Sequence, residues 1–248
     1  MRAATAFFDS AGQPAEVQVT LTKKIPVGAG MGGGSSDAGS VLRALASGHP
    51  QAVSAPRLAA LAASLGADIP YFLDPRPALV RGIGEQIEPI AGFPALPVVV
   101  ATPQPPLRTA DVFRAWDGPP SGGSVRAGLA LTPAEPGRRM PSLSALWNGG
   151  GGDRAEEPDP RVSLEASPSD WRELLVNDLE DTAADLQPGV ARLRIEIERS
   201  GARAVGMSGS GPTVFGLFGS AEEARAAALR ISWDPTDHVH VGNTTSSP

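Results

Sequence analysis

The sequence predicts an α+β protein with two domains, residues 1–94 and residues 95–248. Two patterns support this prediction. A glycine-rich loop between an alternating strand and an amphipathic helix marks the first domain. A β-α-β-β-α-β order of elements, typical of a ferredoxin-like unit, marks the second domain. A long excursion interrupts that unit after its first strand. Within it, residues 133–168 are rich in Pro, Gly, Ser and charge, so we expect a flexible insertion there.

Composition narrows the classes of function. The formal net charge of −6 argues against nucleic acid as an electrostatic partner. The absence of cysteine excludes disulfides, thiol nucleophiles and cysteine-ligated metals. No apolar run is long enough to span a membrane, and no signal segment opens the chain. We therefore expect a cytoplasmic protein without a membrane partner, whose oligomeric state the sequence leaves open.

The first domain begins with a helix and a strand. A short helix is predicted over residues 2–10, and Gly12-Gln-Pro14 ends it. Residues 17–22 then alternate valine or leucine with glutamine or threonine, which predicts a strand with one apolar face.

The loop that follows reads Ile-Pro-Val-Gly-Ala-Gly-Met-Gly-Gly-Gly-Ser-Ser-Asp from Ile25 to Asp37. Glycine permits positive φ and lets a ligand approach the backbone closely. A helix is predicted directly after the loop, with Ser35 or Ser36 as its N-cap and Asp37 in its first turn. Backbone N–H groups at a helix N-terminus form an anion site, and phosphate is the usual occupant. The sequence therefore predicts a phosphate-binding loop.

Two common phosphate loops fit this stretch less well. The P-loop of nucleotide hydrolases ends in Gly-Lys-Ser/Thr, whereas Gly34 is followed directly by Ser35. The dinucleotide fingerprint is met by Gly28, Gly30 and Gly33, but it also needs an acidic residue about 20 positions further on. No Asp or Glu lies between residues 37 and 68.

The rest of the first domain contains a second helix, an aspartate and a hairpin. The helix is predicted over residues 56–65, after a Ser54 cap and before Gly66. Asp68 follows in Gly-Ala-Asp-Ile-Pro, before a short predicted apolar strand, and an aspartate there is usually a turn residue that bonds its own backbone. Two strands flanking Gly-Ile-Gly predict a hairpin over 78–90.

The second domain consists of alternating strand and helix patterns. A further helix is expected over about 171–186, within the excursion. His238 and His240 share one face of the last strand, but no third ligand accompanies them, so no metal site is expected. The predicted strands are 98–100, 202–206, 213–218 and 238–241, and the predicted helices are 190–199 and, after a Ser220 cap, 221–231.

These motifs together resemble the GHMP kinase family of small-molecule kinases. Pro-x-x-x-Gly-x-Gly-Gly-Gly-Ser-Ser, from Pro26, resembles the phosphate loop of the family. Gly-Ala-Asp-Ile-Pro is similar to the segment that carries the catalytic aspartate in one branch, which phosphorylates a cytidine-linked polyol for isoprenoid synthesis. The run Met207-Ser-Gly-Ser-Gly-Pro-Thr213 resembles the C-terminal glycine motif, although a hairpin turn would also explain it. Residues 177–180, Asn-Asp-Leu-Glu, resemble another family segment.

The resemblance implies an ATP- and Mg²⁺-dependent kinase that phosphorylates a hydroxyl of a small molecule. It implies a ribosomal-protein-S5-like ATP-binding domain followed by a ferredoxin-like domain. Asp68 is implied as the base that orients the substrate hydroxyl and accepts its proton. A homoserine- or mevalonate-type kinase stays open, as does an inactive nucleotide-binding remnant. The implied ATP-binding residues are Pro26, Val27, Gly28, Ala29, Gly30, Met31, Gly32, Gly33, Gly34, Ser35, Ser36 and Ser210.

The resemblance fails at the beginning of the chain. Family members start with a strand that carries a Lys-Ile/Val-Asn-Leu pattern, whose lysine is expected to assist phosphoryl transfer. Nothing like it precedes Val17. We therefore expect either a misplaced start or an N-terminally truncated kinase, with an unpaired sheet edge in the first domain. Lys23 and Lys24 flank the glycine loop and are interpreted either as solvated charges or as charges that attract phosphate weakly.

Overall fold

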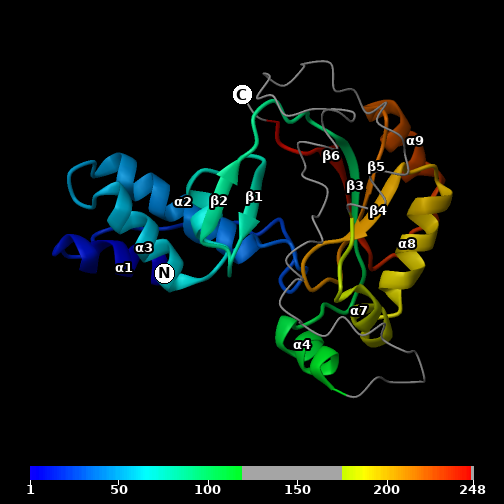
Figure 1. Ribbon diagram of the computed structural model, residues 1–248, viewed down its shortest axis with the longest axis horizontal. Helices are drawn as coiled ribbons and strands as arrows, with labels where there is room; N and C mark the ends of the chain where they lie inside the picture. Colours follow the sequence, from blue (N-terminus) through cyan, green and yellow to red (C-terminus); the bar gives the residue numbers. More distant parts are fainter. Residues whose placement is uncertain (119–174, 247–248) are drawn as a thin grey trace, which may run out of the picture. The chain divides into compact units, whose positions relative to one another are not determined.

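The computed structural model describes residues 1–118 and 175–246 of the chain, and these residues form two units (Figure 1). The first unit holds residues 1–95 and the residues from 245 onward, and the second holds residues 96–244. Helices and antiparallel strand pairs occur in both units, which confirms the α+β class. The insertion predicted at 133–168 lies outside the described residues.

Helices, a 3-10 turn and a hairpin follow one another in the first unit (Figure 1). The two strands pair antiparallel, from Ala78 opposite Pro89 to Arg81 opposite Gln86. The predicted helices and hairpin of this unit are confirmed with small shifts at their ends. The elements are α1 Arg2–Ala11, α2 Gly33–Gly48, α3 Ala55–Leu65, the 3-10 helix η1 Pro70–Leu73, β1 Ala78–Arg81 and β2 Gln86–Pro89.

The core of the first unit lies between α1, α2 and α3. Phe7 of α1, Leu42 of α2 and Ala62 of α3 are completely buried in it. Burying one such phenylalanine side chain stabilises a fold by about 1.5–3 kcal/mol. The short α1 is therefore held by packing, and it ends at Gly12, whose φ of 66° is in the left-handed region that glycine favours.

The strand predicted over residues 17–22 is wrong. This stretch pairs with no other segment of the described residues. Its apolar side chains Val17, Val19 and Leu21 are 43%, 41% and 57% exposed. The alternating pattern supplies an apolar face, but a strand also needs a partner for its backbone N–H and C=O groups. The expected sheet edge is therefore not formed by this stretch, which is instead an exposed, irregular segment that leads into the glycine loop.

The apolar strand predicted after Asp68 is also wrong, because residues 70–73 form η1. The N–H of Phe72 donates to the carbonyl of Ile69, and the N–H of Asp74 donates to the carbonyl of Tyr71. These bonds between residues three apart satisfy the backbone locally, as in other short 3-10 turns. No partner strand is then required.

The second unit is a four-stranded antiparallel sheet with helices on one face (Figure 1). Its strand order is β4-β5-β3-β6, and α8 and α9 pack against the sheet. This is the ferredoxin-like arrangement that the element order predicts. The elements are β3 Pro97–Thr102, α4 Thr109–Asp117, α7 Glu180–Leu186, α8 Gly189–Arg199, β4 Ala204–Met207, β5 Val214–Leu217, α9 Ala221–Arg230 and β6 His238–Asn243.

The apolar core of the second unit joins the sheet to its two covering helices. Val99 of β3 and Val214 of β5 are completely buried, as are Leu193 and Ile197 of α8. Ser220 caps α9 by accepting a hydrogen bond from the N–H of residue 223, as predicted. The helix expected over 171–186 begins only at Glu180 within the described residues, because residues 175–177 are irregular and residues 178–179 form a turn.

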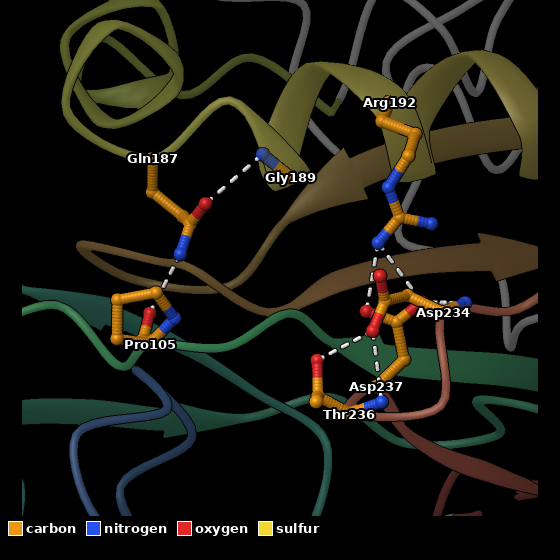
Figure 2. A network of polar contacts seen from close by, with 7 residues as sticks. All are labelled: Pro105, Gln187, Gly189, Arg192, Asp234, Thr236 and Asp237. Carbon is orange, nitrogen blue, oxygen red and sulfur yellow. Dashed lines mark hydrogen bonds and ion pairs between the residues drawn. The ribbon is translucent and has the colours of Figure 1, made fainter.

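Polar contacts fix the loops around α8 (Figure 2). Gln187 is buried, donates to the carbonyl of Pro105 at 2.7 Å and accepts from the N–H of Gly189 at 3.0 Å. Arg192 forms two hydrogen bonds, of 2.7 and 2.9 Å, with the almost completely buried carboxylate of Asp237. This pairing raises the pKa of Arg192 above its ordinary value, so the guanidinium stays charged. The contacts connect α8 to the loop before α4 and to the turn before β6.

Candidate active site

The glycine loop ends at an open helix N-terminus. Gly28, Gly30 and Gly32 have φ values of 73°, 71° and 62°, which side chains with a Cβ rarely adopt. Helix α2 begins at Gly33, and no side chain caps it. The first N–H groups of a helix have no acceptor within the helix. The start of α2 therefore presents backbone donors, together with the positive end of the helix dipole, to an anion.

The predicted N-cap of this helix is wrong. Gly32 is the N-cap, and its carbonyl accepts from the N–H of Ser36 at 2.8 Å. Ser35, Ser36 and Asp37 consequently lie inside the helix. An N-cap serine needs extended backbone angles, whereas the glycines at 33 and 34 already continue the helix from the left-handed Gly32. Both serine hydroxyls thus lie within the first turn or so of α2.

The glycines of α2 have two different surroundings. A Cβ on Gly39 would lie 2.5 Å from the Cβ of Phe72 and 2.9 Å from its carbonyl oxygen, so η1 lies directly against the helix. A Cβ on Gly32 would lie 3.3 Å from the Phe72 ring. A Cβ on Gly34, by contrast, would meet no atom within 4 Å. The helix is therefore tightly packed at Gly39, and its first turn is packed against Ile25 at Gly33 but open at Gly34.

Asp68 lies in the turn between α3 and η1, close in the chain to these contacts. Its side chain is exposed, and no hydrogen bond to its carboxylate is present among residues 1–118 and 175–246. The bond to its own backbone that a turn aspartate usually makes is thus absent. Phe72 lies four positions further along the chain, which limits the Cα separation of Asp68 and Phe72 to about 14 Å even in an extended chain. The carboxylate is available to a ligand in the same part of this unit as the start of α2.

The hairpin supports the segment that contains Asp68. A Cβ on Gly84 would lie 2.7 Å from the carbonyl oxygen of Ala67, so only glycine fits at this contact. Glu85 closes the same turn by accepting from the N–H of Ile83 at 2.7 Å. Hydrogen bonds from backbone N–H groups, including the N–H of Ile83, lower the pKa of the exposed Glu85 carboxyl. These contacts explain by packing why the hairpin predicted around Gly-Ile-Gly has glycine at position 84 and glutamate at position 85.

Lys23 lies beside the first turns of α2. Its Nζ is 2.5 Å from a carboxylate oxygen of Asp37, and both side chains are about one-third exposed, at 35% and 33%. A Cβ on Gly33 would lie 3.6 Å from the same Nζ. Lys23 is therefore not simply solvated, because the structure gives it a defined carboxylate partner next to the open helix start.

The second glycine motif forms the turn between β4 and β5. The N–H of Ser208 donates to the carbonyl of Thr213, and the N–H of Gly211 donates to the carbonyl of Ser208, both at 2.9 Å. Gly209 and Gly211 have positive φ, of 54° and 72°. The hairpin interpretation of this stretch is correct, and the turn is also held by side chains from outside it.

Three contacts hold this turn, and sequence reasoning identified none of them. The buried hydroxyls of Thr102 and Thr213 hydrogen bond at 2.8 Å. The hydroxyl of Ser210, also buried, bonds that of Thr109 on α4 at 2.9 Å. Asn177 bonds two backbone carbonyls of the motif. The Asn-Asp-Leu-Glu segment was the sequence signal for the last contact, whereas nothing in the sequence marks Thr102 or Thr109.

The described residues contain neither a cluster of metal ligands nor a membrane-spanning helix. No three His, Asp or Glu side chains lie together as metal ligands in the parts of the chain that the structure covers. His238 and His240 are exposed on β6. Of the helices within the two described ranges, none combines the length and the apolar character that crossing a membrane requires.

Sequence comparisons relate the chain to known kinases. Residues 1–74 match the model of the GHMP kinases N terminal domain, and residues 163–233 match that of the GHMP kinases C terminal domain. A 4-diphosphocytidyl-2-C-methyl-D-erythritol kinase of Geobacter metallireducens is 36% identical over 93% of this chain and 70% of its own length. A kinase with the same name in Thermus thermophilus is 39% identical over 92% of this chain and 69% of its own length.

Solved structures agree with these relatives. A crystal structure of 4-(cytidine 5'-diphospho)-2C-methyl-D-erythritol kinase matches 98% of this chain and 76% of its own, with a TM-score of 0.66 and 36% sequence identity. The homoserine kinase of Cytophaga hutchinsonii matches 91% of this chain and 70% of its own, with a TM-score of 0.59. Its sequence identity of 22% indicates a shared fold alone.

Proposed function

This chain belongs to the GHMP kinase family, and from that membership we propose that it transfers the γ-phosphoryl group of ATP to a hydroxyl of 4-diphosphocytidyl-2-C-methyl-D-erythritol. The acceptor is the 2-hydroxyl, and the reaction belongs to non-mevalonate isoprenoid precursor synthesis. Kinases named for this substrate are 36–39% identical to most of the chain, which supports this acceptor over homoserine or mevalonate.

The observation that carries the proposal is the uncapped start of α2. In this proposal the loop from Pro26 to Ser36 holds the ATP phosphates. The glycines with positive φ let the phosphates approach the backbone, and the free N–H groups of the first turn donate to them. The helix dipole adds about half a positive charge at this end. The open space at Gly34 leaves room for the anion.

Asp68 is the proposed catalytic base. In phosphoryl transfer the protein mainly positions the reactants and stabilises charge, and a carboxylate orients the attacking hydroxyl. Asp68 is exposed and has no hydrogen bond to the described residues, so its carboxylate can accept one from a substrate hydroxyl. As that oxygen attacks the γ-phosphorus, the same carboxylate takes its proton.

Mg²⁺ enters the proposal as the ion that accompanies ATP. In kinase sites it binds mainly phosphate oxygens and water, with few protein ligands. The hydroxyls of Ser35 and Ser36, at the start of α2, would be its protein contacts. When bound, the ion offsets phosphate charge.

The second glycine motif is proposed as a further nucleotide-binding element. Its backbone is ordered before any ligand binds, because Thr102, Thr109 and Asn177 hold it. Ser210 is the proposed contact residue of this motif. Preorganised backbone donors bind charge without the cost of ordering a loop at the moment of binding.

A substrate panel tests the proposed function. The purified chain is incubated with MgATP and, in turn, the cytidine-linked erythritol, homoserine and mevalonate, and ADP formation is measured. We expect ADP release that depends on the first acceptor and yields its 2-phosphate, identified by ³¹P NMR. Preferred turnover of homoserine or mevalonate would assign a different kinase. ATP binding without transfer to any acceptor would support the inactive nucleotide-binding alternative.

A further inference from the structure

Asn177 joins the start of α7 to the second glycine motif. Its side-chain Nδ2 donates to the carbonyl of Met207 at 3.0 Å and to the carbonyl of Gly209 at 2.8 Å. Its Oδ1 accepts from the N–H of Leu179 at 3.1 Å. One side chain therefore contacts both the turn between β4 and β5 and the segment that enters α7.

The chemistry of these partners requires an amide. Two carbonyl oxygens can only accept and the N–H of Leu179 can only donate, so an orientation with Nδ2 toward the carbonyls satisfies all three. Aspartate has the same shape, but it would place a carboxylate oxygen against two carbonyl oxygens. It would still accept from Leu179. Leucine has a similar size and makes none of the three bonds.

The bond to Gly209 also determines where a neighbouring N–H points. In a planar trans peptide the C=O and the N–H of the next residue point in opposite directions. Holding the Gly209 carbonyl toward Asn177 therefore directs the N–H of Ser210 to the opposite side of the loop. In the part of the chain that the structure describes, that N–H has no hydrogen-bond acceptor. Asn177 thus orients, at the centre of the glycine motif, a backbone N–H for which residues 1–118 and 175–246 supply no acceptor.

We propose that Asn177 is a positioning residue for nucleotide binding, because it fixes the Gly209–Ser210 peptide so that its N–H donates to an ATP phosphate. Asn177 acts through the loop and does not itself touch the nucleotide. The inference rests on the proposed function, in which the second glycine motif binds ATP.

Two variants separate the loop contact from the helix contact. Asn177→Leu removes all three hydrogen bonds at nearly constant size. Asn177→Asp keeps the acceptor for Leu179 and loses the two donors to the loop. Ser220→Ala is the matched control, because it removes the N-cap of α9 in the same unit and leaves the glycine motif untouched. It should lower the Tm without changing the loop.

Hydrogen exchange without nucleotide tests the contact itself. The N–H groups of Ser208 and Gly211 are hydrogen bonded within the turn and should exchange slowly in the parent chain. In both Asn177 variants the N–H groups of Ser208 and Gly211 should exchange faster than in the parent chain. The N–H groups of the paired strands β4 and β5 should exchange at the parent rate. Ser220→Ala should match the parent. Unchanged exchange at Ser208 and Gly211 in both variants would overturn the positioning role.

Calorimetry and kinetics test the consequence for ATP. Two lost hydrogen bonds correspond to a weakening of about 10- to 100-fold in the Kd for ATP, and both Asn177 variants should show it. The KM for ATP should rise in parallel while the KM for the acceptor stays constant, a split that general destabilisation would not produce. Parent-like ATP affinity in Asn177→Leu contradicts the inference alone. Failure of the parent chain to bind ATP contradicts the proposed function itself.

Discussion

At the scale of single residues, Asp68 could act either as a turn residue or as the catalytic base, and the two roles predict different outcomes of one substitution. As a turn residue it would bond its own backbone, and asparagine would replace it without loss. The structure shows an exposed carboxylate without a hydrogen bond from any described residue. That finding removes the main support for a purely local role and makes the substitution informative.

We expect Asp68→Asn to retain ATP affinity and the Tm while its turnover falls by about 10²- to 10⁴-fold, the usual contribution of a general base. The amide can still orient a hydroxyl, but it cannot accept the proton. Steady-state kinetics and calorimetry on the same preparation provide the measurement. A kcat within about twofold of the parent, with ATP binding intact, would show that Asp68 is not the base.

Individual residues also show what sequence could and could not predict. The glycine loop and Asp68 were found because each lies in a short continuous motif. Asn177 was noticed only as part of a family-like segment, and its function as a contact depends on carbonyls 30 and 32 positions away. Thr109 and Ser210 meet across 101 positions, and although Ser210 lies in the second glycine motif, nothing in the sequence marks Thr109 as its partner.

At the scale of elements, local signals predicted helices well and strands less reliably. The apolar spacing and turn residues of α1 and α3 are local, and both helices form where expected. Residues 17–22 have an equally regular alternation, yet no described segment pairs with them. Strand formation depends on a partner elsewhere in the chain, which periodicity cannot supply.

The contact between α2 and η1 gives a stability prediction. Gly39→Ala would place a Cβ 2.5 Å from the Cβ of Phe72, so η1 must move. Such overpacking typically costs about 1–3 kcal/mol, more than alanine gains in helix propensity. We expect a lower Tm in thermal unfolding followed by circular dichroism.

Gly48→Ala is the matched control for this prediction, because a Cβ at the last position of α2 meets no atom within 4 Å. The same exchange of glycine for alanine in the same helix should leave the Tm unchanged or raise it. Equal Tm values for the two variants would contradict the close packing of η1 on α2.

At the scale of the whole molecule, the order of elements predicted more than any single element. The β-α-β-β-α-β order predicted the ferredoxin-like unit correctly, and the structure adds its sheet order, β4-β5-β3-β6. It did so because chain order and short connections leave few ways to pair such strands. The expected insertion lies outside the described residues. The family emerged from motifs distributed along the chain, and the matches over residues 1–74 and 163–233 support it.

The claim that connects fold to function is that the open start of α2 binds the phosphates of ATP. Gly34→Val tests it directly, since a Cβ at this exposed position meets no atom within 4 Å and leaves the packing intact. Its side chain would occupy the space that the phosphates need. Gly48→Val makes the same substitution at the other end of α2, also in open space.

The decisive measurement is the Kd for MgATP of the parent chain and of these two valine variants by isothermal titration calorimetry, with the Tm of each as the check on folding. We expect the parent and Gly48→Val to bind ATP equally and Gly34→Val to lose binding by about 100-fold or more, which corresponds to roughly 2.7 kcal/mol. Equal affinity in all three proteins, at equal Tm, would contradict phosphate binding at the start of α2.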